Sequence, residues 1–403
     1  MRLLARVAAA ALLTVTPIAA GSASAAAPEP TPAPLKTAAN AVPGQYIVTL
    51  EKGQDAAKVV QRLGLKASFI YTSAINGFAV PLTPLQLTLV RNSLGVKAVE
   101  EDAKVQTGMM PSSGPGTRAP SSSWGLDRID QKDNWDKDNG TGDGQFAPEG
   151  NGSGVTAYIL DTGIEYAHAE FGGPDSTRAT FGFDAIGDGR NGADCQGHGT
   201  HVAGTVAGKT YGVATKANLV SVRVLGCDGK GENSGIIAGL DWVAKNAKQP
   251  AVLNVSLGGD ESTAVNDAAN AVTDAGVLPI AAAGNSAQAA CLVSPAGASK
   301  VFTVAASNKY DEETDFSNHG TCVSLYAPGE AIMSAKLGGG SVALNGTSMA
   351  APHVTGVAVL YKAKNPSAAP GDIVEFLDDE STKDLLTKMS PGTSNKLLYL
   401  GGL

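Results

Sequence analysis

The stretch VTAYILD, residues 155–161, is an almost unbroken run of apolar residues that ends on a carboxylate. Four later runs share this character: LVSVRVL at 219–225, AVLNVSL at 251–257, GVLPIAAAG at 276–284 and VFTVAAS at 301–307. Such runs are typical of strands buried on both faces of a parallel sheet. Helical spacing of apolar residues marks three segments between them: THVAGTVAG at 200–208, GIIAGLDWVAKNA at 235–247 and AVNDAANAVTDAG at 264–276. The pattern predicts a three-layer α/β domain with a parallel sheet over residues 124–403.

The first 25 residues have the composition of a targeting segment. Residues 1–25 begin with two arginines, continue through an Ala/Leu/Val stretch and end on small residues. This order predicts a secretory signal peptide cleaved after Ala25. A membrane anchor is disfavoured because Thr14, Pro17 and Gly21 shorten the apolar run. We therefore expect a secreted, extracellular protein.

Three further segments precede the α/β domain. Residues 26–44 are rich in Pro and Ala without periodicity, which predicts a disordered or extended spacer. Residues 45–107 alternate in the order strand, helix, two strands, helix, strand, which predicts a small split-βαβ, ferredoxin-like α+β domain. Its helices are expected near 56–62 and 85–92, and its last strand near 96–102. Residues 108–123 are rich in Pro, Gly and Ser, which predicts an exposed linker open to proteolysis.

Charge and cysteine content narrow the possible partners. The net charge of -8 argues against nucleic acid as a partner, and no later apolar run suggests a membrane segment. The absence of a C-x-x-C pair disfavours a structural zinc site. In an exported chain the four cysteines are candidates for disulfides, with free buried thiols as the alternative: Cys195, Cys227, Cys291 and Cys322.

Three polar residues occur in motifs that suggest one chemistry. Asp161 ends a strand before a tight turn, His198 lies between two glycines in GHGTHVAG, and Ser348 lies in NGTSMAAPHV at the start of the last long helix. A serine hydroxyl becomes a nucleophile when an imidazole takes its proton, and the imidazole needs a carboxylate to hold its tautomer. The chain order Asp, His, Ser is one of those known for such a triad.

Each of these residues also has a simpler interpretation. Asp161 alone could be a turn residue, and Ser348 alone could be a helix N-cap. His198 and His201 together could bind a metal, although no other histidine stands at a ligand-like spacing. The three motifs in one order favour the triad.

The blocks YILDTGI, GHGTHVAG and NGTSMAAPHV together resemble the catalytic blocks of the subtilisin-like serine proteases, from Trp124 to Leu403. WGLDRIDQ, SLGG and AAAGN are similar to the proteinase K branch, and the cysteine positions resemble aqualysin-like members. Residues 45–107 resemble the inhibitory propeptide domain of the same family. The resemblance implies a subtilisin-like fold and a secreted endopeptidase made as a self-processing precursor.

The resemblance also implies roles for individual residues. Ser348 would be the nucleophile that forms an acyl-enzyme, His198 the general base and then acid, and Asp161 the orienting carboxylate. Asn285, in AAAGN, would donate its side-chain amide to the oxyanion together with the N–H of Ser348. Two alternatives belong to other classes. A non-catalytic binding protein is disfavoured by the complete triad, and an esterase by the lack of a G-x-S-x-G motif.

Substrate is expected to bind as an added strand against two edges, 229–233 and 256–259. The pocket before the cut would be formed by 256–259 and 282–284, none of them charged, which predicts a preference for large apolar or aromatic residues. The expected partners are polypeptide substrates and the chain's own propeptide, as inhibitor and folding aid, on a monomeric enzyme. The expected substrate-binding residues are Gly229, Gly231, Asn233, Ser256, Leu257, Gly258, Gly259, Ala282, Ala283 and Gly284.

Disulfides and calcium are further implications of the resemblance. The aqualysin-like positions pair in sequence order, which implies Cys195 with Cys227 and Cys291 with Cys322. Asp127, Asp130 and Gln131 match ligands of a structural calcium site in these relatives; the alternative is an acidic turn paired with Arg128 or Lys132. Ser324 stands where proteinase K supplies the carboxylate of another calcium site, so we expect that second site to be weak or absent.

Overall fold

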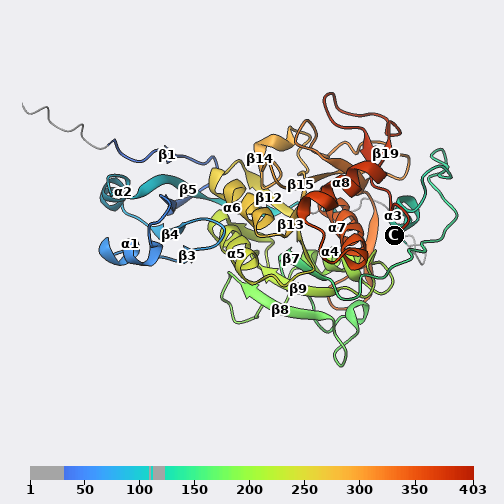
Figure 1. Cartoon of the computed structure of the whole chain (residues 1–403), viewed down its shortest axis with the longest axis horizontal. Coiled ribbons are helices and arrows are strands. Elements are labelled where there is room, and N and C mark those ends of the chain that lie inside the picture. Colours follow the sequence, from blue (N-terminus) through green and yellow to red (C-terminus); the bar gives the residue numbers. More distant parts are fainter. Residues whose placement is uncertain (1–30, 109, 112–122) are drawn as a thin grey trace, which may run out of the picture.

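The computed structural model describes residues 31–108, 110–111 and 123–403. The expected signal peptide and most of the expected linker lie outside the described residues. Figure 1 shows a small N-terminal domain, blue to teal, packed against a larger domain, green to red. Within the described part of the chain, no helix is both long enough and apolar enough to cross a membrane.

The larger domain is built on a nine-stranded sheet that contains all five predicted strands. The strand order is β19-β20-β16-β15-β13-β11-β7-β9-β8, and every neighbouring pair is parallel except β19 with β20. The strands are β7 (Thr156–Asp161), β8 (Ala179–Asp184), β9 (Asn218–Arg223), β11 (Ala251–Val255), β13 (Leu278–Ala282), β15 (Phe302–Ser307), β16 (Leu325–Pro328), β19 (Thr382–Lys383) and β20 (Lys396–Leu397). This topology brings the carboxyl ends of the parallel strands to one edge, where α/β sheets hold their sites.

Helices cover both faces of this sheet, which confirms the three-layer prediction. On β7, Ala157 and Ile159 pack with α4 (His198–Ala207), α7 (Thr347–Lys364) and α8 (Pro370–Glu380). Tyr158 and Leu160 point to the other face and pack with α5 (Asn233–Asn246) and α6 (Thr263–Asp274). This alternation along one strand follows from the two-residue period of β structure.

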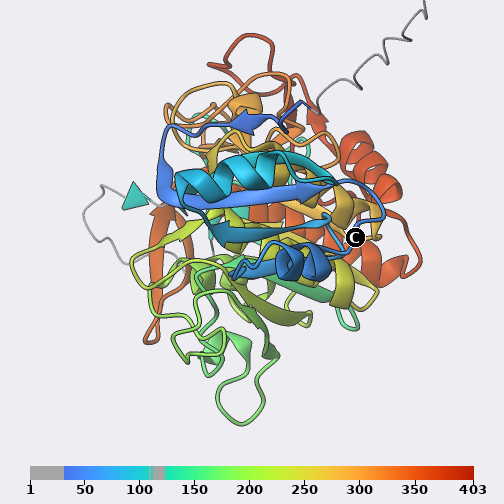
Figure 2. The same cartoon turned by 90° about the vertical axis from the view of Figure 1, so that its left-hand side faces the viewer.

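The small domain has the predicted ferredoxin-like order. Its strands β2 (Ala41–Leu50), β3 (Phe69–Tyr71), β4 (Gly77–Pro81) and β5 (Val96–Thr107) form a sheet in the order β5-β2-β4-β3. Helices α1 (Ala56–Arg62) and α2 (Pro84–Arg91) cover its outer face, and Figure 2 shows them in front of the larger domain. The inner face, with Ile47 and Tyr71, shares a core with α5. The two domains therefore bury a common interface.

The structure corrects two of the expected segment boundaries. Within the expected spacer, β1 (Leu35–Lys36) pairs with β5 and β2 begins at Ala41. In the expected linker, β6 (Met110–Pro111) pairs with β18 (Ser341–Asn345), which also pairs with β17 (Ile332–Ala335). Pairing at the edge of a sheet uses backbone groups and needs little side-chain pattern. The Pro-rich composition of both segments therefore gave no sign of these short strands.

Candidate active site

Asp161 and His198 form a buried pair at the carboxyl edge of the sheet. Asp161 ends β7 and His198 begins α4. The Nδ1 atom of His198 lies 2.7 Å from Oδ1 of Asp161, and both side chains are 0% exposed. Nε2 of His198 has no hydrogen-bond partner among the described residues. The carboxylate therefore orients the ring and leaves Nε2 available to accept a proton.

Two glycines explain how the histidine comes so close to the strand end. Gly197 caps α4 with a φ of 108°, a left-handed conformation that favours glycine. A Cβ atom on Gly199 would lie only 2.2 Å from the carbonyl oxygen of Gly163. The GHG motif therefore allows the backbone contact that puts His198 beside Asp161.

Ser348 is the second residue of α7 and is not its cap. The N-cap is Gly346, and no side chain caps this helix end. Pro352, four residues further on, has no N–H for the Ser348 carbonyl, and that carbonyl accepts a hydrogen bond of 2.9 Å from Oγ of Ser256 instead. Oγ of Ser348 in turn donates to the Ser256 carbonyl at 3.1 Å. In this conformation the serine hydroxyl is bonded to Ser256 and not to His198.

Asn285 presents its amide to the end of β5. Its Nδ2 donates to the carbonyl oxygen of Gly108. Its Oδ1 accepts hydrogen bonds from N and Oγ1 of Thr347, at 2.8 Å and 2.9 Å. The residue before Ser348 therefore fixes the amide orientation, a role for Thr347 that the sequence analysis missed although the residue lies within the GTS motif.

The end of β5 occupies the cleft as an added strand. It runs antiparallel between β10 (Lys230–Glu232) and β12 (Leu257–Asp260), with Val105 opposite Gly231 and Gln106 opposite Gly258. The N–H of Thr107 donates to the Gly229 carbonyl at 3.0 Å. Gly108, the next residue along the chain, accepts the hydrogen bond from the Asn285 side chain, and residues 110–111 pair with β18. The described residues on either side of this point thus pair with both walls of the cleft, β10 and β12 before it and β18 after it.

Most of the predicted substrate-binding residues line this cleft or pair with β5. Three of them do not. Ser256 is buried and bonds to the backbone of Ser348, and Ala283 is buried with its N–H bonded to the Val304 carbonyl. Asn233 is the first residue of α5 and is not among the residues that line the cleft. The cleft is lined by five residues from the predicted set together with Asn285 and Ser348: Leu257, Gly258, Gly259, Ala282 and Gly284.

Buried carboxylates join the two domains beside the cleft. Oδ1 of Asp102 accepts the N–H of Ser234 at 3.0 Å, at the start of α5. Glu100 accepts the N–H of Ala264 and the hydroxyl of Ser262 at the start of α6. Burial raises the pKa of both carboxyls above the usual value. Negative groups at helix N-termini are stabilising, so these contacts help to hold the small domain in place.

The remaining predicted residues are placed as follows. Disulfides join Cys195 to Cys227 and Cys291 to Cys322, as the resemblance implied. The metal interpretation of His201 is not supported, because its Nε2 contacts the carbonyls of Ile332 and Val342 at 3.1 Å. Asp188, Cys195 and Cys227 also lie close enough together to bind a metal ion, but the two cysteine sulfurs are joined in a disulfide and are not available as thiolate ligands.

The acidic turn at residues 127–131 does not have the expected basic partners. Arg128 is buried and pairs with Asp311 at 2.7 Å, and Lys132 lies over the ring of Tyr399. Asp127 accepts the N–H groups of Gly142 and Gly144. Burial, together with the charges of Asp127 and Asp143, raises the pKa of Asp130 to about 6 against the opposing hydrogen bonds. The carboxylates of Asp127 and Asp130 have no basic partner among the described residues. Neighbouring carboxylate oxygens of this kind are ligands that suit a hard cation.

Comparisons with known proteins identify the family of each domain. Residues 152–397 match the model of the subtilase family, and residues 61–108 match that of peptidase inhibitor I9. The chain is 42% identical over 335 residues to alkaline serine exoprotease A of Vibrio alginolyticus, which covers 83% of this chain and 60% of that protein. It is 39% identical over 389 residues, 90% of either chain, to the extracellular serine proteinase of Thermus sp. (strain Rt41A).

A solved structure gives the same assignment. The crystal structure of a cold adapted subtilisin-like serine proteinase matches with a TM-score of 0.66 and 45% identity, over 70% of this chain and 98% of that one. The two family models together match both parts of the molecule. The chain belongs to the subtilase family of serine proteinases and carries an I9-type propeptide domain before its catalytic domain.

Proposed function

We propose that the protein is a secreted serine endopeptidase that uses Asp161, His198 and Ser348 and is made as a self-processing precursor. The observation that carries the proposal is the buried Asp161–His198 contact of 2.7 Å, together with a strand of the same chain in the cleft that Asn285 and Ser348 line. The signal-peptide pattern at 1–25 and the extracellular relative support secretion.

In the proposed reaction, Ser348 attacks the carbonyl carbon of the bound peptide while its hydroxyl proton passes to Nε2 of His198. The hydroxyl first turns away from the Ser256 carbonyl, since catalytic hydrogen bonds often form only with substrate in position. Asp161 stabilises the imidazolium. Asn285 and the N–H of Ser348 stabilise the oxyanion. His198 then returns the proton to the leaving amine, and water releases the acyl group by the same steps.

The first substrate would be the chain itself, cut between Gly108 and Met109. Gly108 is the residue whose carbonyl oxygen meets the Asn285 amide, and the strand on its N-terminal side pairs with β10 and β12. After the cut, β5 would remain in the cleft as a product and block other substrates. The hydrogen bonds from the starts of α5 and α6 to Asp102 and Glu100 of the small domain support this inhibitory role.

For other substrates, we propose a preference for large apolar or aromatic residues before the cut. The cleft beside Asn285 is lined by small and apolar groups such as Leu257, Ala282 and Val293. Its charged lining residues, Lys104, Lys230 and Asp260, lie on the paired strands. Rates of hydrolysis of peptide substrates that differ only in the residue before the cut would measure the preference.

We also propose structural calcium at the acidic turn, held by Asp127, Asp130 and Gln131. The two carboxylates have no basic partner among the described residues, and a dication would offset their mutual repulsion. At the position of Ser324 the hydroxyl instead accepts the N–H of Thr303, which supports a weak or absent second site.

A covalent label tests the proposed chemistry directly. A serine-directed fluorophosphonate should modify the mature enzyme once, at Ser348, and abolish hydrolysis of casein in proportion to labelling. Ser348→Ala should be unlabelled and inactive, whereas Ser367→Ala, at an exposed serine beyond α7, should behave as wild type. Activity that survives complete labelling, or a label on another residue, would contradict the proposal.

A further inference from the structure

Asp194 is a buried carboxylate close to the Asp161–His198 pair, and it has no part in the proposed reaction steps. It is 8% exposed, and its hydrogen bonds come from neutral donors. Oδ1 accepts from N of Gln196 and N of Gly197, both at 2.9 Å, just before His198. Oδ2 accepts from N and Oγ1 of Thr200, at 3.0 Å and 2.6 Å, in the first turn of α4. The carboxylate therefore fixes the turn and the helix start that carry the histidine.

The same carboxylate also contacts the element that carries Asp161. The hydroxyl of Thr162 donates to Oδ1 of Asp194 at 2.9 Å and accepts the N–H of Gly199 at 2.9 Å. The backbone N–H of Thr162 donates to Oδ1 of Asp161 at 2.7 Å. Thr162 thus binds the catalytic carboxylate with its backbone, and both Asp194 and the histidine helix with its side chain.

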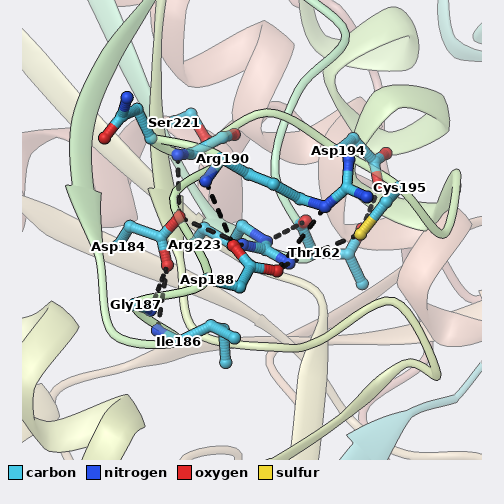
Figure 3. Close-up of polar contacts among 12 residues, drawn as sticks. Thr162, Asp184, Ile186, Gly187, Asp188, Arg190, Asp194, Cys195, Ser221 and Arg223 are labelled. Carbon is cyan, nitrogen blue, oxygen red and sulfur yellow. Dashed lines mark hydrogen bonds and ion pairs between the residues drawn. The ribbon is translucent and has the colours of Figure 1, made fainter.

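The carbonyl of Thr162 is held as well. Nε of Arg223 donates to it at 3.2 Å, and Arg223 lies opposite Asp161 in the β7–β9 register. The guanidinium is fully buried and is paired with Asp184 at 3.1 Å and Asp188 at 2.7 Å. Figure 3 shows Arg223 reaching toward Thr162, with Asp188 across the guanidinium and Asp194 nearby. All three polar groups of Thr162 are therefore engaged.

We infer that Asp194, acting through Thr162, is a positioning residue that sets the distance and orientation of His198 relative to Asp161. The inference rests on the proposed triad. Asp194 and Thr162 join two elements that are distant in sequence, β7 with its turn and α4 with its cap. A buried carboxylate at the positive end of a helix holds that end firmly, because each donor directed at it would be left unpaired without it.

The expected effect is on turnover and not on substrate binding. Displacing a catalytic group by about 1 Å costs on the order of 100-fold in rate. Asp194→Asn, in which a donor replaces one acceptor oxygen, and Thr162→Val, which removes the hydroxyl, should each lower kcat by about 10- to 100-fold. KM should stay within about twofold, because β10 and β12 pair with substrate through backbone groups that neither residue contacts.

The experiment measures kcat and KM on a peptide substrate, per active site titrated with a fluorophosphonate, after maturation by a trace of tagged wild-type enzyme that is then removed. Thr162→Ser keeps the hydroxyl and should retain kcat within about threefold of wild type. Asp175→Asn, the same change at an exposed site, should have no effect. Thermal melting of each precursor identifies folded variants; if Asp194→Asn has no cooperative transition, Thr162→Val decides.

Three results would overturn the inference: kcat within threefold of wild type in the folded variants, a loss confined to KM, or a Thr162→Ser variant as slow as Thr162→Val. Ser348→Ala in the same assay separates this failure from that of the proposed function. If Ser348→Ala is inactive while Asp194→Asn and Thr162→Val are normal, only the positioning role is wrong. If Ser348→Ala is active, the triad itself is wrong.

Discussion

Asp241 offers a way to weaken propeptide binding without changing the proposed triad. This carboxylate projects from α5, and its Oδ1 accepts three backbone N–H groups of the small domain, from Thr72 at 3.0 Å, Ser73 at 2.7 Å and Ala74 at 2.7 Å. Asp241→Ala removes all three bonds. The three N–H groups are only partly buried, so water can reach them in the variant complex and only the net strength of each bond counts.

The magnitude follows from these three bonds. Hydrogen bonds to charged groups contribute about 1.5–3 kcal/mol each, but three donors share one oxygen here, so we take about 1 kcal/mol apiece. A loss of about 3 kcal/mol corresponds to a roughly 100-fold weaker propeptide, since 1.4 kcal/mol is tenfold. Asp241→Asn, which keeps an uncharged acceptor, should have an intermediate effect.

The assay is inhibition of the mature enzyme by a fragment of residues 31–108, with hydrolysis of a short peptide as the signal. The inhibition constant should rise about 100-fold for Asp241→Ala while kcat and KM for the short peptide stay unchanged. Asp267→Asn, at an exposed position of the neighbouring helix α6, is the matched control. An inhibition constant within threefold of wild type for Asp241→Ala would refute the interface described above.

Asn285→Ala should lower kcat by about 100- to 1,000-fold with little change in KM, the usual loss for one oxyanion donor, and steady-state kinetics with unchanged turnover would remove Asn285 from that role. Replacing Cys195 and Cys227 by serine opens a loop of 32 residues, which the loop-entropy model equates with about 3.7 kcal/mol of unfolding free energy; denaturant unfolding in an inactive background measures this, and a loss under about 1 kcal/mol contradicts the model. Calcium at a hundredfold excess over Kd should stabilise the folded enzyme by about 2.7 kcal/mol, and Asp127→Asn with Asp130→Asn should abolish the shift in thermal inactivation; a double variant that keeps the whole shift would locate the calcium elsewhere.

The elements of the fold could be predicted where the local side-chain pattern determines them. The apolar run at 155–161 became β7, and the helical spacing at 264–276 became α6, because burial of one strand or one helix face is written in consecutive residues. The segments β1 and β6 were missed because each is held by a few backbone pairs at an edge. Such pairing depends on which strand lies opposite, and a single sequence does not state this.

The site shows the same division. The motifs identified Asp161, His198 and Asn285, and the structure brings them to one edge of the sheet. The bond from Ser348 to the Ser256 carbonyl and the role of Thr347 depend on a rotamer and on a neighbour in space. Across the domain interface, the partners of Asp241 lie 167 to 169 residues away, a separation over which no local pattern can indicate contact.

N-terminal sequencing of the first cleavage product tests the central claim most directly. It asks whether Ser348 cuts the peptide bond after Gly108, whose carbonyl oxygen accepts a hydrogen bond from Asn285. Wild-type precursor, purified away from other proteases, should yield a catalytic fragment that begins at Met109, while Ser348→Ala precursor stays joined through Gly108. A Ser348→Ala precursor that still cuts itself, or a first wild-type cut at a bond other than Gly108–Met109, would contradict the account.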